Sequence, residues 1–155
     1  MSQKKFTPQE VADKISDADE AFHSLGIELI SAVPGKAKMS MKVRPNMLNC
    51  LGILHGGILF SLADTALAFA SNVDNVVSYT YSSTIYFLSS VSVGEEIIAV
   101  TEEDNTAAED GTKSGRTSFY TTTVFGKDMR RVAVVQGVTR SVDETVIDVI
   151  EQAKP

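Results

Sequence analysis

The segment from Asn49 to Asn72 constrains the fold of this chain more than any other stretch. It begins with a polar residue, passes a His-Gly-Gly turn at 55–57 and then continues for about four helical turns with almost no polar side chain. Between residues 58 and 70 the polar side chains are those of Ser61, Asp64 and Thr65. A helix that is apolar on nearly every side packs on more than one surface, so this segment predicts a central, buried helix.

The remaining patterns predict a sheet for that helix to pack on. An amphipathic helix is expected at about 8–25, begun by a Thr7–Glu10 capping box, and a short helix in the tail 143–155, begun by Ser141 and Glu144. Strands are expected at 27–33, 37–43, 76–88, 96–101, 116–125 and 130–142. The 76–88 run is rich in β-branched and aromatic residues and predicts a well-buried strand.

These elements indicate an α+β architecture in which an antiparallel sheet wraps around one long helix. The 155 residues fit a single domain, with the core at about 26–142. A helix can face such a sheet on one side only. Its remaining apolar surface therefore predicts a partner subunit in a symmetric dimer.

Composition and charge exclude several classes of function. A net charge of −6 argues against a broad nucleic-acid surface and against binding to anionic membranes. No apolar run reaches the roughly 18–20 residues that span a bilayer, and residues 1–14 lack the apolar core of a signal peptide. The single cysteine, Cys50, fits a reducing cytoplasm. Two histidines and one cysteine make a zinc site, or any metal centre built by the chain, an unfavoured hypothesis.

Two features of the central segment suggest acyl-transfer chemistry. Asp64 either lies on a narrow polar face or is a carboxylate held in a partly apolar crevice, where its basicity suits the activation of water. Gly56 and Gly57 either form a tight turn or present the N–H groups of the helix start to a carbonyl oxygen. The spacing of eight residues between Gly56 and Asp64 strengthens the functional interpretation of both.

Neighbouring residues leave alternatives open. His55 can act as a general base or fix the turn through hydrogen bonds, and Asn49 can direct its amide N–H at the same carbonyl or cap a turn. A Cys50–His55 nucleophile pair is disfavoured because no acyl-enzyme signature surrounds it. Lys113 and Arg116 can meet nucleotide phosphates or be solvated surface charges.

His55-Gly56-Gly57, followed by Leu62, Asp64 and Ala66 and preceded by Asn49, resembles the hotdog-fold acyl-CoA thioesterases, and specifically their phenylacetate-pathway (PaaI-type) branch. Residues 84–88 resemble the strand that follows the helix in that family, and the strand order fits from about 26 to 141. The chain departs from the family at Ser89-Ser90, where a proline is usual, and at Tyr86, where an acid or amide is common.

The resemblance implies a hotdog fold, a homodimer with active sites across its interface, and a further pairing of dimers. It places the Gly56 N–H and the Asn49 side chain on the thioester carbonyl, with His55 supporting the loop and Gly57 beside the substrate. Asp64 of the other subunit acts as general base or nucleophile. A hydroxyl of the next strand assists, with Thr80 as the best positional match and Ser82 and Ser83 as its neighbours.

We therefore expect hydrolysis of an aromatic or medium-chain acyl-CoA to the free acid and coenzyme A, without metal or redox cofactor. The alternative from another class is a non-catalytic acyl-CoA-binding or regulatory module on the same scaffold. A hotdog hydratase or dehydratase is less favoured, because those enzymes depend on a catalytic histidine and an acid in a different pattern.

Overall fold

The computed structural model of the chain describes residues 5–104 and 115–153, so the expected phosphate contact Lys113 lies outside the described residues. The helices are α1 (Pro8–Ala18), α2 (Glu20–Leu25), α3 (Gly56–Asn72) and α4 (Val146–Gln152). The strands are β1 (Ile27–Val33), β2 (Lys36–Lys42), β3 (Val76–Phe87), β4 (Glu96–Glu103), β5 (Thr117–Phe125) and β6 (Arg131–Thr145). Single 3-10 turns occupy Pro45–Met47 and Lys127–Met129. None of the helices described is both long and apolar enough to cross a membrane.

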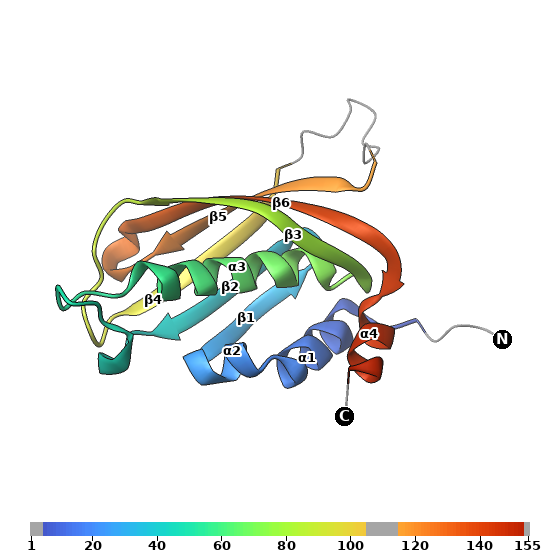
Figure 1. Cartoon of the computed structure of the whole chain (residues 1–155), viewed down its shortest axis with the longest axis horizontal. Helices are drawn as coiled ribbons and strands as arrows, with labels where there is room; N and C mark the ends of the chain where they lie inside the picture. Colours follow the sequence, from blue (N-terminus) through green and yellow to red (C-terminus); the bar gives the residue numbers. More distant parts are fainter. Residues whose placement is uncertain (1–4, 105–114, 154–155) are drawn as a thin grey trace.

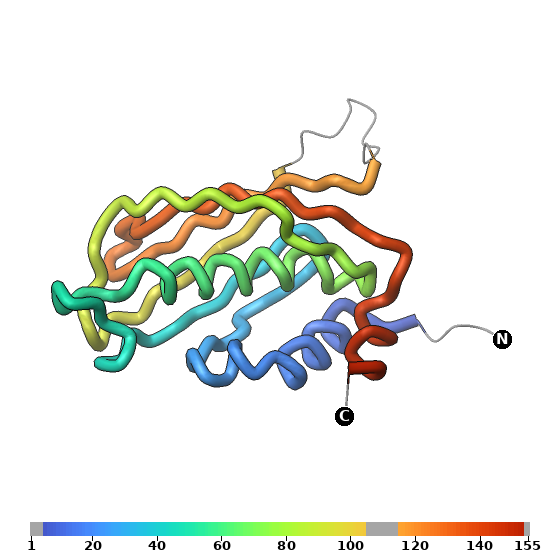
Figure 2. The backbone as a smooth tube through the Cα atoms, viewed as in Figure 1, coloured from blue at the N-terminus to red at the C-terminus, as the bar shows by residue number. Residues whose placement is uncertain are grey.

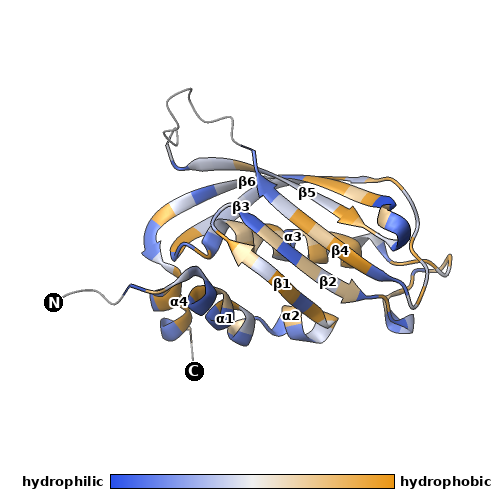
Figure 3. Cartoon of the chain, turned by 180° about the vertical axis from the view of Figure 1, so that it is seen from behind, coloured by the Kyte–Doolittle hydropathy of each residue, from blue (hydrophilic) through white to orange (hydrophobic). Residues whose placement is uncertain are grey.

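The six strands form one antiparallel sheet in the order β1-β2-β4-β5-β6-β3. The sheet curls around α3, while α1, α2 and α4 lie together along its lower margin (Figures 1 and 2). Viewed from behind, β1, β2 and β4 face the reader with no helix in front of them (Figure 3). The expected α+β architecture, a sheet wrapped around one central helix, is confirmed.

Helix α3 forms the centre of the core. Its Leu62, Leu67 and Phe69 side chains are fully buried, together with alanines that allow close packing on the strands. Gly137 of β6 makes one of these close approaches possible, because a Cβ there would overlap the Leu67 Cδ1 atom. The position of α3 on the sheet therefore depends on a glycine far away in the sequence.

The N-terminal helix differs from the expected continuous helix at 8–25. The Thr7–Glu10 capping box is present, but the helix breaks at Asp19, which has extended backbone angles. Asp19 Oδ1 accepts the Phe22 N–H at 3.0 Å and begins α2, so this aspartate acts as an N-cap instead of continuing the first helix. Gly26 ends α2 in the left-handed region, at φ +65°.

Strand β3 is not the well-buried strand that its composition predicts. Tyr79, Tyr81 and Tyr86 are each more than half exposed. The physical reason is position: β3 is the last strand of the sheet, pairs only with β6 among the described strands, and turns one face outward. The residue composition of a segment predicts that it forms a strand, but it does not predict whether that strand lies at the edge of the sheet.

The expected cap at the C-terminal helix is also wrong. Strand β6 continues to Thr145, so Ser141 and Glu144 lie within the strand. The Thr145 hydroxyl accepts the Asp148 N–H and begins α4. The cap was missed because the strand extends beyond the last regular apolar alternation.

Candidate active site

The start of α3 leaves one backbone N–H group free to bind a ligand. His55 is the N-cap, and its Nδ1 accepts the Gly57 N–H at 3.0 Å. The His55 carbonyl accepts the N–H groups of Ile58 and Leu59. Within the described chain the Gly56 N–H has no hydrogen-bond partner, as expected for the first residue of a helix. The helix dipole adds a partial positive charge at this N–H.

His55 occupies the position that its turn-fixing alternative predicts. Its N–H donates to the Met47 carbonyl at 2.9 Å, which ties the turn to the preceding loop. A ring nitrogen that accepts a hydrogen bond carries no proton, so the neutral imidazole holds its proton on Nε2. The side chain that caps the helix is thus in the wrong tautomer to take up a proton at Nε2, and the geometry favours a supporting role.

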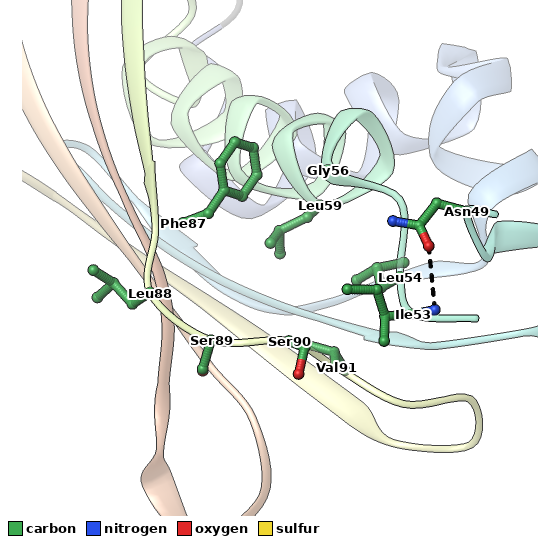
Figure 4. A pocket seen from close by; sticks show the side chains of 10 residues that line it. All are labelled: Asn49, Ile53, Leu54, Gly56, Leu59, Phe87, Leu88, Ser89, Ser90 and Val91. Atoms are coloured by element: carbon green, nitrogen blue, oxygen red, sulfur yellow. Dashed lines mark hydrogen bonds between the residues drawn. The ribbon is translucent and has the colours of Figure 1, made fainter. Parts of the chain in front are cut away.

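Asn49 lies beside Gly56 with its amide orientation fixed. Its Oδ1 accepts the Leu51 N–H at 2.9 Å and the Ile53 N–H at 3.3 Å. Since both partners are donors, the oxygen must face them and the NH₂ group must point the other way. Figure 4 shows the Nδ2 atom on the side of Gly56. The structure describes no acceptor for Nδ2, so two N–H donors, from Gly56 and Asn49, are available at one place.

A cavity of about 360 Å³ opens in front of these two donors. Apart from Asn49 and Gly56 it is lined by Ile53, Leu54, Leu59, Phe87, Leu88, Ser89, Ser90 and Val91 (Figure 4). The ring of Phe87 packs on the helix start, because a Cβ on Gly56 would lie 3.0 Å from its Cε1 and Cζ atoms. The pocket is therefore an apolar chamber with hydrogen-bond donors at one end.

Asp64 lies two turns along α3 and does not line this cavity. Its side chain is half-buried, and desolvation raises the pKa of the Asp64 carboxyl above its usual 3.8. A rise of about 1.5 Å per residue separates Asp64 from Gly56 by roughly 12 Å along the helix axis. The two groups of one chain are therefore too far apart to act on the same carbonyl.

The three candidate hydroxyls of β3 lie in different surroundings. Thr80 pairs with buried Thr139, and Ser83 pairs with buried Gly137, so both belong to the face of β3 nearer α3. Ser82 is exposed and points to the opposite face from Ser83. The Ser83 Oγ atom is buried without any hydrogen-bond partner in the structure described. Buried hydroxyls without a hydrogen bond are rare, so the Ser83 Oγ is a candidate to form a hydrogen bond with a bound molecule.

Arg116 is not brought to the cavity. It precedes β5, is exposed, and forms an ion pair with Asp143. Arg130 does contact the cavity wall from outside, where it is held by Glu95, and sequence reasoning missed both residues. Arg130 was included only as the start of the last strand. No periodicity or motif links it to a loop about forty residues earlier.

The fold and this site together define a class of protein. An antiparallel sheet wrapped around one central helix is the hotdog architecture, and here two N–H donors at the start of that helix face an apolar pocket.

Comparisons with known proteins identify the family. Residues 51–108 match the thioesterase superfamily. The acyl-coenzyme A thioesterase PaaI of Escherichia coli K12 is 30% identical over 135 residues, which cover 87% of this chain and 91% of that protein. The E. coli PaaI structure, from the phenylacetic acid degradation operon, has a TM-score of 0.81 at 29% identity and covers 89% of this chain and 95% of that chain. The PaaI phenylacetic acid degradation protein of Thermus thermophilus, solved as a mutant, has a TM-score of 0.72 at 28% identity, over 80% of this chain and 100% of that chain. This chain belongs to the PaaI-type acyl-CoA thioesterases of the hotdog fold.

Proposed function

We propose that this enzyme hydrolyses an acyl-CoA thioester by holding the carbonyl oxygen between the Gly56 N–H and the Asn49 Nδ2. The observation that carries the proposal is the pair of unpaired donors facing one apolar pocket. As water attacks, negative charge develops on the carbonyl oxygen, and preorganised donors stabilise it. Removing one such donor typically costs about 10²–10³ in rate. Gly57 and His55 support this geometry by fixing the first turn of α3.

Asp64 of a second subunit is the proposed general base, with direct nucleophilic attack as the alternative. Because Asp64 and Gly56 of one chain lie roughly 12 Å apart along α3, the base must come from elsewhere. A second copy whose α3 runs antiparallel beside the first can place its Asp64 opposite Gly56. The raised pKa of Asp64 brings its basicity closer to that needed to activate water, and positioned general bases contribute about 10²–10⁴ in rate.

Strand β3 is the proposed dimer edge. It is the exposed last strand of the sheet, and its free side can pair with the same strand of a second copy about a twofold axis. If Asp64 meets Gly56 of the partner subunit, the axis passes beside residue 60, midway between them. Phe87 lies level with Gly56. A strand rises about 3.3 Å per residue against 1.5 Å in a helix, so the two β3 strands should cross near Ile85.

A cross-linking experiment tests this arrangement. In a Cys50→Ser background, single cysteines placed at each position from 82 to 87 should form intersubunit disulfides most readily near residue 85. Cysteine at Val33 of β1, on the opposite edge of the sheet, is the matched control. Cross-linking through position 33 but not through β3 would refute the proposed interface.

Ser83 is the proposed assisting hydroxyl, ahead of Thr80 and Ser82. Ser83 lies four residues before Phe87 on β3, which is about 13 Å along the strand. Because Phe87 lies level with Gly56, this distance brings Ser83 level with Asp64 on α3. Its buried, unsatisfied Oγ is available to hydrogen-bond the attacking water or the Asp64 carboxylate. Ser83→Ala should lower kcat, whereas Ser82→Ala removes a hydroxyl from the other face and should not. Equal effects of the two substitutions would refute this assignment.

Subunit complementation tests the shared site. Asn49→Ala and Asp64→Asn should each abolish most turnover as homodimers. A 1:1 mixture refolded together should recover about a quarter of the wild-type activity, because half the dimers are mixed and each mixed dimer has one intact site of two. A site built within one chain predicts no recovery. Coenzyme A release can be followed with a thiol reagent in the Cys50→Ser background, since Cys50 is exposed and would react.

The proposed substrates are aromatic or medium-chain acyl-CoA thioesters, and no metal or redox cofactor enters the reaction. The apolar lining, including Leu59, Phe87 and Val91, supports such acyl groups. The operon of the E. coli relative supports a role in phenylacetate breakdown, and the proposed location of the reaction is the cytoplasm. We also propose that two dimers pair into a tetramer. Lys113 and Arg116 are the proposed contacts for the nucleotide phosphates of coenzyme A. Arg116→Ala should then raise KM for acyl-CoA but leave that for an acyl-pantetheine unchanged.

The alternative is a non-catalytic acyl-CoA-binding module on the same scaffold. It would bind acyl-CoA and release no coenzyme A with any thioester. The half-buried Asp64 argues against this alternative, because a pure binder gains nothing from a carboxylate whose desolvation is costly.

A further inference from the structure

Arg130 contacts the wall of the active-site pocket from outside without lining the pocket. It lies between the 127–129 turn and β6, and its guanidinium reaches two residues of the wall. Nη1 donates to Ser89 Oγ at 2.6 Å and to the Ser90 carbonyl at 2.7 Å. Nη2 donates to Glu95 Oε2 at 3.0 Å. One planar group thus joins the wall to the turn before β4.

Ser90 is the point of the wall that depends on this contact. On one side of it, the Leu88 and Ser89 N–H groups both donate to the Val132 carbonyl. On the other side, the Val91 carbonyl accepts the Leu54 N–H at 2.9 Å, which joins the two walls of the pocket. Between these anchors, the described structure gives the polar atoms of Ser90 one hydrogen bond, from Arg130.

The guanidinium is itself held in place. Glu95 Oε1 accepts the Ser92 N–H at 2.8 Å while Oε2 binds Arg130. The Ser92 N–H and the charge of Arg130 lower the pKa of Glu95, so this carboxylate is ionised at neutral pH. Gly126 leaves room for the group, since a Cβ there would lie 3.2 Å from Arg130 Nη2 and 3.5 Å from Glu95 Oε2. The Glu95 side chain is only 21% exposed, so the pair is partly shielded from water.

We propose that Arg130 is a positioning residue for the substrate, which holds Ser90 in place and so sets the width of the pocket opposite Gly56 and Asn49. The inference rests on the proposed function, because it takes the acyl thioester to occupy this pocket. Arg130 touches no reacting atom. Its loss should weaken substrate binding and blur discrimination between acyl groups, while the carbonyl-binding donors and Asp64 stay intact.

The kinetic test compares Arg130→Lys and Arg130→Ala with a matched control, Arg131→Ala. Arg131 carries the same charge one residue away, and its side chain forms no hydrogen bond or ion pair within the described chain. Lysine keeps the charge but cannot donate to the wall and to Glu95 in the fixed fork of a guanidinium. Both Arg130 variants should raise KM about tenfold, the cost of ordering roughly one residue on binding, with kcat within about twofold. Arg131→Ala should match the wild type.

A rescue and a structural measurement separate positioning from general loss of structure. Ser90→Pro restricts the backbone, keeps the carbonyl and removes an N–H that has no partner in the described structure. Added to Arg130→Ala, it should reverse part of the rise in KM. Hydrogen exchange should be faster in the 88–91 segment of Arg130→Ala and unchanged in α3.

The outcomes distinguish this inference from the proposed function. Wild-type enzyme that hydrolyses no thioester would overturn the proposed function, and with it the effect on substrate. An active wild type together with Arg130 variants of unchanged KM and unchanged exchange in the 88–91 segment would overturn only the role of Arg130. Equal falls in kcat for Arg130→Ala and Arg131→Ala would also overturn it, because general charge and not the wall contact would then matter.

Discussion

Gly137→Ala is the sharpest test of how the central helix sits on the sheet. The new Cβ would overlap Leu67 Cδ1, and Leu67 is fully buried on α3. Gly137 has no positive φ, so alanine is not strained by the backbone itself. In an open strand the change would stabilise by about 0.5–1 kcal/mol, since glycine loses more backbone entropy on folding. The overlap with Leu67 therefore decides whether Gly137→Ala raises or lowers the free energy of unfolding.

Overpacking a tight core costs about 1–3 kcal/mol, so the net free energy of unfolding should fall by roughly 1–2 kcal/mol. Leu67→Ala alone should cost about 2–5 kcal/mol through the cavity it leaves. In the double variant the new methyl group at position 137 has room in that cavity. The double variant should therefore be about as stable as Leu67→Ala, with a coupling energy of about 1–2 kcal/mol, equal in size to the cost of Gly137→Ala alone.

Urea unfolding of the four proteins at one fixed concentration measures this cycle, since the stability of an oligomer depends on concentration. A Gly137→Ala protein as stable as the wild type, or costs that simply add in the double variant, would refute the claimed contact. Asp64 lies one turn before Leu67 on the same helix. If the clash shifts α3, kcat should fall together with stability.

The geometry of the site leads to three further predictions. Burial raises the pKa of Asp64, so activity that needs its carboxylate should fall as pH drops through a midpoint above the usual 3.8, and kcat measured against pH locates that limb. The same raised pKa means that the ionised form weakens folding above it. Asp64→Asn should thus stabilise the protein near neutral pH, with the gain shrinking toward pH 3.8 in thermal unfolding. Gly56→Ala places a methyl 3.0 Å from the Phe87 ring and should raise KM; adding Phe87→Leu should restore binding, and failure of that rescue would place the fault elsewhere.

Local patterns in the sequence were enough for the helix start of the site. His55, Gly56 and Asn49 lie within one short segment, and a glycine pair ahead of an apolar helix has few possible geometries. Strand β1 was predicted at its observed bounds for the same reason, since Gly26 and Pro34 enclose it. Where one residue's neighbours along the chain decide its conformation, the sequence is informative.

The opposite wall of the pocket could not be predicted in this way. Ser90, Glu95 and Arg130 meet only because β3, β4 and β6 bring distant segments together, and no spacing in the chain records that meeting. The burial of β3 was wrong on similar grounds. An aromatic, β-branched strand has the same composition at the centre of a sheet as at an edge that is covered by a partner.

Three features of the described chain are incomplete in a single copy. The β3 edge is unpaired in the described sheet, Asp64 is too far from Gly56 of its own chain, and the Ser83 hydroxyl lacks a partner. Pairing two copies through β3 would complete the edge and bring Asp64 to Gly56 of the partner in one step, next to Ser83. Assembly and catalysis would then depend on the same contacts. Activity per chain should fall on dilution along the same curve as dimer dissociation measured by fluorescence anisotropy, and activity that persists in isolated monomers would refute the shared site.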